Sequence, residues 1–309
     1  RANNRTRGQL LSIYMFITLI GISLGTLLLN FSSPEKYEPF ILVSLLLSLA
    51  LIPILLTKRK APKFKRLGYI DIKGLYKTSP LATVSMFCTG TIHSALFALG
   101  AVYAASMNFT IFEISLLLFV VTVSGGLFQW PIGYYSDKSD RRIIIIFCTF
   151  FASLFCFLAI LASGTSLENM YLATSVGIDK IMFFTYMAVY AGMAIPLFTL
   201  NLAYVNDYIP KEKFVAAGGG MQIIFGLGAM GGPFSCSLLM NKFGTNGFFI
   251  YLLTFHLIIG FFGLYRITKR SYKDNPESTY TPLPRNITPL GIQLDPTTGA
   301  DISGDEKSK

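Results

Sequence analysis

The residues of this sequence that could do chemistry are few, and they fall into two groups. The segment "GYYSDKSDRR", at residues 133–142, places five charged side chains within six residues. The second group is a pair of histidines, His93 and His256, each near the centre of a long apolar run. A neutral imidazole in apolar surroundings can donate and accept a hydrogen bond, and its charge state responds near physiological pH. The histidines are therefore candidates for recognising a ligand, and the charged segment is a candidate for a contact that depends on charge.

The spacing of the other reactive residues does not support an enzyme, metal or cofactor site. The two histidines lack the H-x-x-x-H spacing of a helical metal site, and the sequence contains neither a nucleophile elbow nor a phosphate-binding loop. All four cysteines lie inside apolar runs without a C-x-x-C pair, which is typical of small buried hydrophobic residues. We therefore expect no catalytic residue, no bound metal and no cofactor.

The elements that must position these groups are long apolar runs. The chain is 52% hydrophobic and 14% charged, whereas a soluble domain is about 25% charged. At about 1.5 Å per residue, a run of about 20 residues crosses the roughly 30 Å hydrocarbon core of a bilayer, and it does so as a helix. Eight such runs occur, at about 10–29, 38–56, 80–105, 113–135, 143–163, 180–206, 214–240 and 247–267. The sequence therefore predicts an all-α polytopic membrane protein with eight transmembrane helices.

The net charge of +10 indicates how these helices are oriented. Under the positive-inside rule, the gaps rich in Lys and Arg are cytoplasmic, and so is the C-terminus. The basic excess is thus a topology signal, and no nucleic-acid partner is expected. The loop at residues 133–142 could serve orientation alone, but that alternative leaves its two acidic residues unexplained, because Asp and Glu contribute little to orientation. The Lys and Arg residues that fall in the opposite gaps are Lys36, Lys180 and Lys242.

A weak internal repeat divides the chain into two unequal parts. Gly21 and Gly25 align with Gly228 and Gly232, and glycines at this spacing are expected at helix-packing positions. Four apolar runs precede the second copy and none precedes the first, so the repeat indicates a six-plus-six architecture without its first four helices. The expected divisions are 1–57 (the last two helices of an N-terminal bundle), 58–79 (a basic cytoplasmic linker), 80–270 (a C-terminal six-helix bundle) and 271–309 (a disordered cytoplasmic tail).

The charged loop resembles a known signature. "GYYSDKSDRR" is similar to the loop motif G-x-x-x-D-R/K-x-G-R-R of the major facilitator superfamily, with Asp140 in place of the usual glycine. The segments "RGQLLSIYM" and "NDYIPKEKFVAAGGG" look like the YcaD-like branch of that superfamily, and the resemblance covers about residues 5–270. It implies a twelve-helix transporter, of which this chain would supply the fifth to the twelfth helices. The residues that match the loop motif are Gly133, Asp137, Lys138, Arg141 and Arg142.

The resemblance also implies which residues act in transport. It places the lining of a central cavity on the helices at 80–105 and 180–206, and it assigns a gating role to the five loop residues. Asp137 would meet the start of the helix at 10–29 when the cytoplasmic side is closed. The alternative for each lining residue is helix packing, in which an interhelical hydrogen bond satisfies the polar group. The expected substrate-binding residues are Thr89, His93, Phe97, Tyr186, Tyr190 and Asn201.

The function implied by this resemblance is secondary active transport of a small solute across the cytoplasmic (inner) membrane by alternating access. The expected partners are that solute and membrane lipid, and coupling to a proton or ion gradient stays open. The complete protein is expected to be a monomer. The alternatives are a transport-inactive truncated remnant or scaffold and, with less support, a membrane-embedded enzyme.

Overall fold

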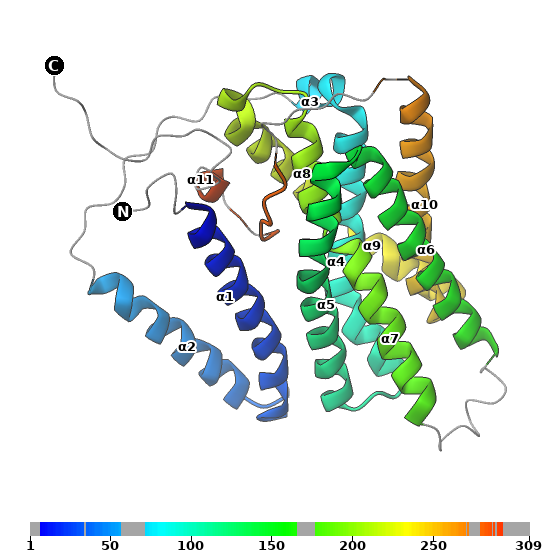
Figure 1. Cartoon of the computed structure of the whole chain (residues 1–309). Helices are drawn as coiled ribbons and strands as arrows, with labels where there is room; N and C mark the ends of the chain where they lie inside the picture. The colour runs from blue at the N-terminus through cyan, green and yellow to red at the C-terminus, as the bar shows by residue number, and fades with distance from the viewer. Residues whose placement is uncertain are drawn as a thin grey trace.

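The computed structural model describes residues 7–33, 35–56, 72–165, 177–269, 271, 279–285, 287 and 289–292, and the regular structure of this part is entirely helical. Figure 1 shows the arrangement. The elements are α1 (Arg7–Leu27), η1 (Leu28–Asn30), α2 (Glu38–Leu55), α3 (Ile72–Thr78), α4 (Pro80–Ser106), α5 (Ile111–Lys138), α6 (Arg141–Thr165), α7 (Gly177–Ala194), α8 (Leu197–Asn206), η2 (Lys211–Lys213), α9 (Phe214–Phe243), α10 (Asn246–Lys269) and α11 (Pro289–Ile292). Among the described residues, seven helical stretches are long and apolar enough to span a membrane, and the apolar stretch Glu38–Pro53 of α2 is shorter.

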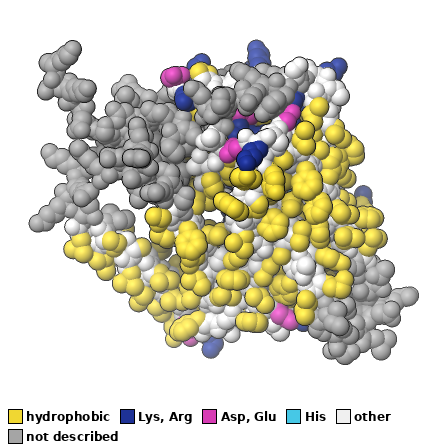
Figure 2. Space-filling model, in the orientation of Figure 1, with side chains coloured by type: hydrophobic (Ala, Val, Ile, Leu, Met, Phe, Trp, Pro, Cys, Tyr) yellow, Lys and Arg dark blue, Asp and Glu magenta, His cyan; other side chains and the backbone are white. Residues whose placement is uncertain are grey.

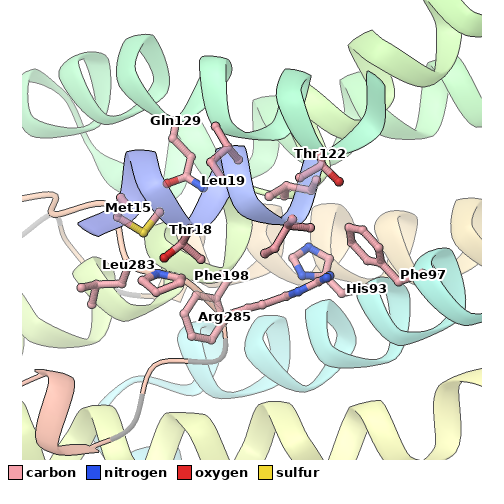
Figure 3. Close-up of a pocket in the computed structure, with 13 residues that line it drawn as sticks. Met15, Thr18, Leu19, His93, Phe97, Thr122, Gln129, Phe198, Leu283 and Arg285 are labelled. Atoms are coloured by element: carbon pink, nitrogen blue, oxygen red, sulfur yellow. The ribbon is translucent and has the colours of Figure 1, made fainter. Parts of the chain in front are cut away.

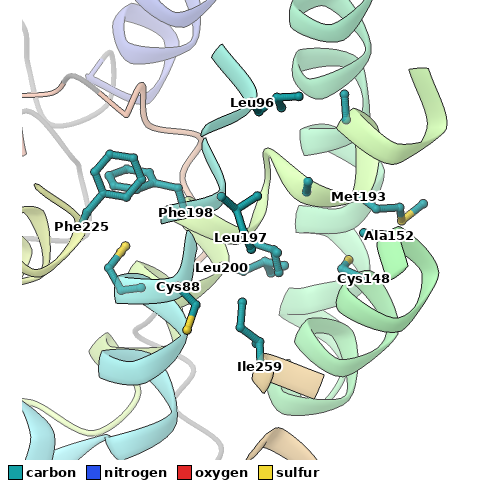
Figure 4. Close-up of a cluster of buried hydrophobic side chains, with 14 of the residues drawn as sticks. Cys88, Leu96, Cys148, Ala152, Met193, Leu197, Phe198, Leu200, Phe225 and Ile259 are labelled. Carbon is teal, nitrogen blue, oxygen red and sulfur yellow. The ribbon is translucent and has the colours of Figure 1, made fainter. Parts of the chain in front are cut away.

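The predicted helix at 180–206 is two helices in the structure. α7 ends at Ala194 and α8 begins at Leu197, with Pro196 between them. Proline has no backbone N–H, and its ring clashes with the carbonyl four residues earlier, so it interrupts the helical hydrogen bonds. All residues of α8 are buried, and Figure 4 shows Leu197 and Leu200 among the hydrophobic side chains of the surrounding helices. The break therefore lies inside the bundle.

The six-helix bundle is built from three helix pairs, α4 with α9, α5 with α7, and α6 with α10. The first pair is packed most closely. A Cβ atom on Gly228 would lie 2.1 Å from the carbonyl oxygen of Phe87, and one on Gly232 would lie 2.1 Å from Ser94 Oγ. Gly228 and Gly232 thus occupy the helix-packing positions that the sequence predicts, because no larger residue allows this approach.

The corresponding expectation for Gly21 and Gly25 differs from the structure. Neither glycine has an atom within 4 Å of the place where a Cβ would be. α1 instead packs on α5 through another face, on which Leu19 covers Gly126 and Asn30 Nδ2 donates a hydrogen bond of 2.6 Å to Ser115 Oγ. The two glycine pairs that the repeat aligns therefore differ in their surroundings, since only Gly228 and Gly232 lie against a neighbouring helix among the described residues.

The outer surface of the helices is apolar. Figure 2 shows hydrophobic side chains over the middle of the visible face, with Lys, Arg, Asp and Glu near its ends. Large exposed side chains include Phe16 and Leu47 on the two N-terminal helices and Trp130 on α5. Such a band is expected where lipid, rather than water, surrounds the helices.

The described part of the predicted tail is packed against the bundle. Tyr280, Leu283, Ile287 and Ile292 are buried, because their apolar side chains cover the ends of α5, α8 and α9. Residues 272–278 and 293–309 lie outside the described residues. The predicted linker likewise ends in a helix, α3, with Leu75 buried, and its residues 58–71 lie outside the described chain.

Candidate functional site

A cavity of about 70 Å³ lies where α1, α4, α5, the break between α7 and α8, and the tail segment meet. Figure 3 shows its side chains, which come from parts of the sequence that are far apart. The lining is mostly apolar with a few polar groups, which is typical of a small-molecule site. Its residues are Met15, Thr18, Leu19 and Ile22 of α1; His93 and Phe97 of α4; Thr122 and Gln129 of α5; Ile195 and Phe198 at the helix break; and Leu283, Pro284 and Arg285 of the tail.

His93 connects the cavity to the helix break. Its Nε2 atom lies 3.1 Å from the carbonyl oxygen of Ala194, the last residue of α7. Because a carbonyl oxygen can only accept, Nε2 carries the hydrogen, and Nδ1 of the neutral ring is an acceptor. Nδ1 is buried without a hydrogen-bond partner among the described residues. His93 therefore presents an unused acceptor in the part of the molecule that encloses the cavity.

Arg285 is the cation of this cavity, and the sequence analysis did not single it out. Its guanidinium carbon lies 3.5 Å from the centre of the Phe97 ring, which is cation–π geometry. Its carbonyl oxygen accepts a hydrogen bond of 2.8 Å from Gln222 Nε2. Burial lowers the pKa of Arg285 to about 10, so the side chain is charged at neutral pH. In the sequence, the prolines at 282 and 284 favour an extended backbone, which indicates that the segment before Arg285 is not a helix.

The other four predicted substrate-binding residues lie in helix contacts rather than in the cavity lining. Asn201 Nδ2 donates a hydrogen bond of 3.2 Å to Thr89 Oγ1, which joins α8 to α4. Tyr190 stacks on His256, with ring centres 5.5 Å apart, and Tyr186 contacts Phe155 edge to face. For Thr89 and Asn201 the arrangement corresponds to the packing alternative. Of the six predicted substrate-binding residues, His93 and Phe97 thus line the cavity in the structure.

A charge cluster lies at the end of the bundle where α5 and α6 are joined. Arg141 pairs with Asp137 at 2.6 Å and also with Asp207, directly after α8, and its Nε donates to Ser136 Oγ at 3.2 Å. The backbone N–H of Tyr280 donates a hydrogen bond of 2.8 Å to the same Asp137 carboxylate. Among the described side chains, Asp137 therefore contacts Arg141 and the tail, and the expected contact with the start of α1 stays a prediction. Residues 1–6 and the side chains of residues 7–12 lie outside the described part of the chain.

The other residues predicted to act in gating have separate local contacts. Arg142 pairs with Asp140 at 2.6 Å, and the Asp140 carboxylate accepts from the Arg142 backbone N–H at the start of α6. Asp140 has no positive φ, so the glycine of the motif is not required here. Lys138 lies over the ring of Tyr134 on the surface. A Cβ on Gly133 would lie 2.3 Å from the Tyr280 ring, so this glycine makes room for the tail.

Comparison with known proteins adds the decisive observation for the fold. Residues 2–200 match the sequence profile of the Major Facilitator Superfamily. The chain belongs to this superfamily. The membership, together with the long apolar helices, confirms the predicted all-α bundle and a multi-pass membrane protein of the Major Facilitator Superfamily.

Several relatives of the chain belong to the same superfamily. An uncharacterized MFS-type transporter of Yersinia enterocolitica is 25% identical over 248 residues, which are 80% of this chain and 60% of the relative. The uncharacterized MFS-type transporter YcaD of Escherichia fergusonii is 23% identical over 257 residues, or 82% of this chain and 63% of the relative. The chain thus spans about 60% of the length of these relatives. No solved structure matches the chain.

Proposed function

We propose that this chain forms part of a secondary transporter that moves a small solute across the cytoplasmic membrane by alternating access. The observation that carries the proposal is the cavity between α1 and the six-helix bundle, with His93 and Phe97 in its wall. Transporters of this class bind solute between two helical bundles and near interrupted helices. The break at Pro196 beside the cavity supports that assignment.

In this proposal the ion pairs of Arg141 with Asp137 and Asp207 stabilise one conformational state, and α8 links them to the cavity. α8 has ten residues and is therefore about 15 Å long. It begins at the cavity wall, with Phe198 in its first turn, and Asp207 follows its last residue. A shift of α8 on solute binding would move Asp207 relative to Arg141, and a contact made in one state only biases the equilibrium toward that state. Arg141 is thus the central gating residue, and Asp137 acts with it because its carboxylate pairs with the same guanidinium.

The chain corresponds in this proposal to helices five to twelve of a twelve-helix protein, with the charge cluster and the C-terminus on the cytoplasmic side and the complete protein a monomer. The internal repeat supports the assignment of the helices, and the chain spans 60–63% of the length of the relatives. We expect the 309-residue chain alone not to transport, because half of the cavity wall would be missing. Saturable solute uptake into liposomes by this chain alone would contradict the assignment.

Alternating access is tested with a single cysteine in the complete protein. The four cysteines of this chain are buried and free. With any cysteine outside this chain replaced by serine, a membrane-impermeant thiol reagent therefore reports on the introduced residue. Phe97→Cys should be labelled from either side of the membrane, and Asp137→Asn should increase labelling from the cytoplasm. The control is Phe87→Cys on the exposed apolar face of the same helix, which should resist the reagent. Labelling of Phe97→Cys from one side only, unchanged by Asp137→Asn, would favour the transport-inactive scaffold.

A further inference from the structure

The tail residue Arg285 places a positive charge in the wall of the cavity. Arg285 lines the cavity, and no Asp or Glu of the described residues forms an ion pair with it. The Arg285 side chain is half-buried, and a guanidinium partly removed from water without a counter-charge is normally paired with an anion. The arrangement therefore leaves a place for a negative group that the described chain does not supply.

Arg285 is held in a fixed position by its surroundings. The face of its guanidinium rests on Phe97, and Gln222 binds its backbone carbonyl. Leu283, two residues earlier, is buried, and its carbonyl oxygen accepts a hydrogen bond from Thr199 Oγ1 at 3.4 Å. A guanidinium whose face is stacked keeps its N–H groups along its edge, and these match the two oxygens of a carboxylate.

Two buried acceptors lie in the same cavity wall. His93 and Gln129 are 1% and 7% exposed, and both line the cavity. Neither His93 Nδ1 nor Gln129 Oε1 has a hydrogen-bond partner among the described residues. An acceptor left without a donor loses its hydration without compensation, so a ligand that brings a donor would stabilise the site. Figure 3 shows the Arg285 side chain ending near the His93 ring, with Gln129 on the α5 side of the cavity.

We propose that this cavity binds a small carboxylate that also carries a hydrogen-bond donor, such as a short hydroxy acid, and that Arg285 of the tail is its carboxylate-binding residue. The inference rests on the proposed function, since it names the solute class of the same site. A cationic solute would be repelled by Arg285, and a neutral one would leave the guanidinium unpaired. A simple carboxylate without a donor would leave His93 Nδ1 and Gln129 Oε1 unsatisfied.

The test is equilibrium binding to the purified full chain in detergent, measured by calorimetry and by the shift in melting temperature. The chain alone is not expected to transport, but it contains every residue that lines the described cavity. Sodium glycolate supplies a carboxylate and a hydroxyl, sodium acetate lacks the hydroxyl, and glycolamide lacks the charge. We expect saturable binding of glycolate, weaker binding of acetate and no binding of glycolamide. Arg285→Gln should weaken glycolate binding by about tenfold or more, the usual effect of removing a charged hydrogen-bond partner.

The matched control is Arg266→Gln, at the end of α10 and outside the cavity, which should bind glycolate as the unchanged chain does. Arg285→Lys keeps the charge but loses the two-pronged geometry, and it should bind with intermediate affinity. Equal binding of glycolamide and glycolate, unchanged binding in Arg285→Gln, or no binding of glycolate at all would each overturn the proposal. Cysteine labelling that still alternates between the two sides would then show that only the solute class was wrong.

Discussion

The Nε2 atom of His93, on α4, donates a hydrogen bond to the carbonyl oxygen of Ala194 at the end of α7. The two residues are 101 positions apart in the sequence. This bond fixes the interrupted helix against the cavity wall at the point where Pro196 removes the regular backbone pairing. The same side chain therefore positions the break and faces the cavity.

His93→Ala is expected to reduce transport by the complete protein more than His256→Ala does at equal expression. His93 loses a hydrogen bond at the break, whereas His256 stacks on Tyr190 and has no hydrogen-bond partner among the described residues. A transition state destabilised by about 1.4 kcal/mol corresponds to about a tenfold lower rate. Initial uptake rates, normalised to the amount of protein in the membrane, measure the difference. Equal effects or the reverse order would count against the cavity assignment of His93.

Asp207→Asn is expected to destabilise the protein more than Asp137→Asn. Both carboxylates pair with Arg141, but the Asp207 side chain is 5% exposed and the Asp137 side chain 33%. Removing one partner of a buried pair costs about 3–5 kcal/mol, whereas a partly exposed pair contributes about 1 kcal/mol or less. Thermal unfolding in detergent, followed by circular dichroism, gives the comparison. The idea fails if the two variants melt at the same temperature.

Gly228→Ala and Gly21→Ala are expected to change stability in opposite directions. The added methyl group at position 228 would lie 2.1 Å from a backbone oxygen of α4, so the two helices must separate, at a cost of about 1–3 kcal/mol. Position 21 has open space, and there alanine improves helix propensity by up to about 1 kcal/mol. The apparent melting temperatures of the purified variants test the pair. A destabilised Gly21→Ala protein would mean that α1 packs closely through this glycine after all.

Part of this protein is determined by local sequence. The eight apolar runs predict the helices, because the length needed to cross a bilayer and the cost of unpaired backbone groups in lipid leave little other choice. The glycine spacing predicts the close crossing at Gly228 and Gly232, and the loop motif predicts a charged site at Asp137 and Arg141. Each of these signals lies within one or two neighbouring helices.

The tertiary structure determines which residues line the cavity. Arg285 meets Phe97, and the Tyr280 backbone meets Asp137, across a separation of 143 residues in the second case. The composition of the tail predicted disorder. Composition does not show that a few tail side chains pack against the ends of α5, α8 and α9. The family resemblance likewise assigned Thr89, His93 and Asn201 to the cavity lining, but only the packing of the helices separates the residue that lines the cavity from the pair that bond to each other. Burial and pairing depend on the neighbours that the fold brings together, and these neighbours are not adjacent in the sequence.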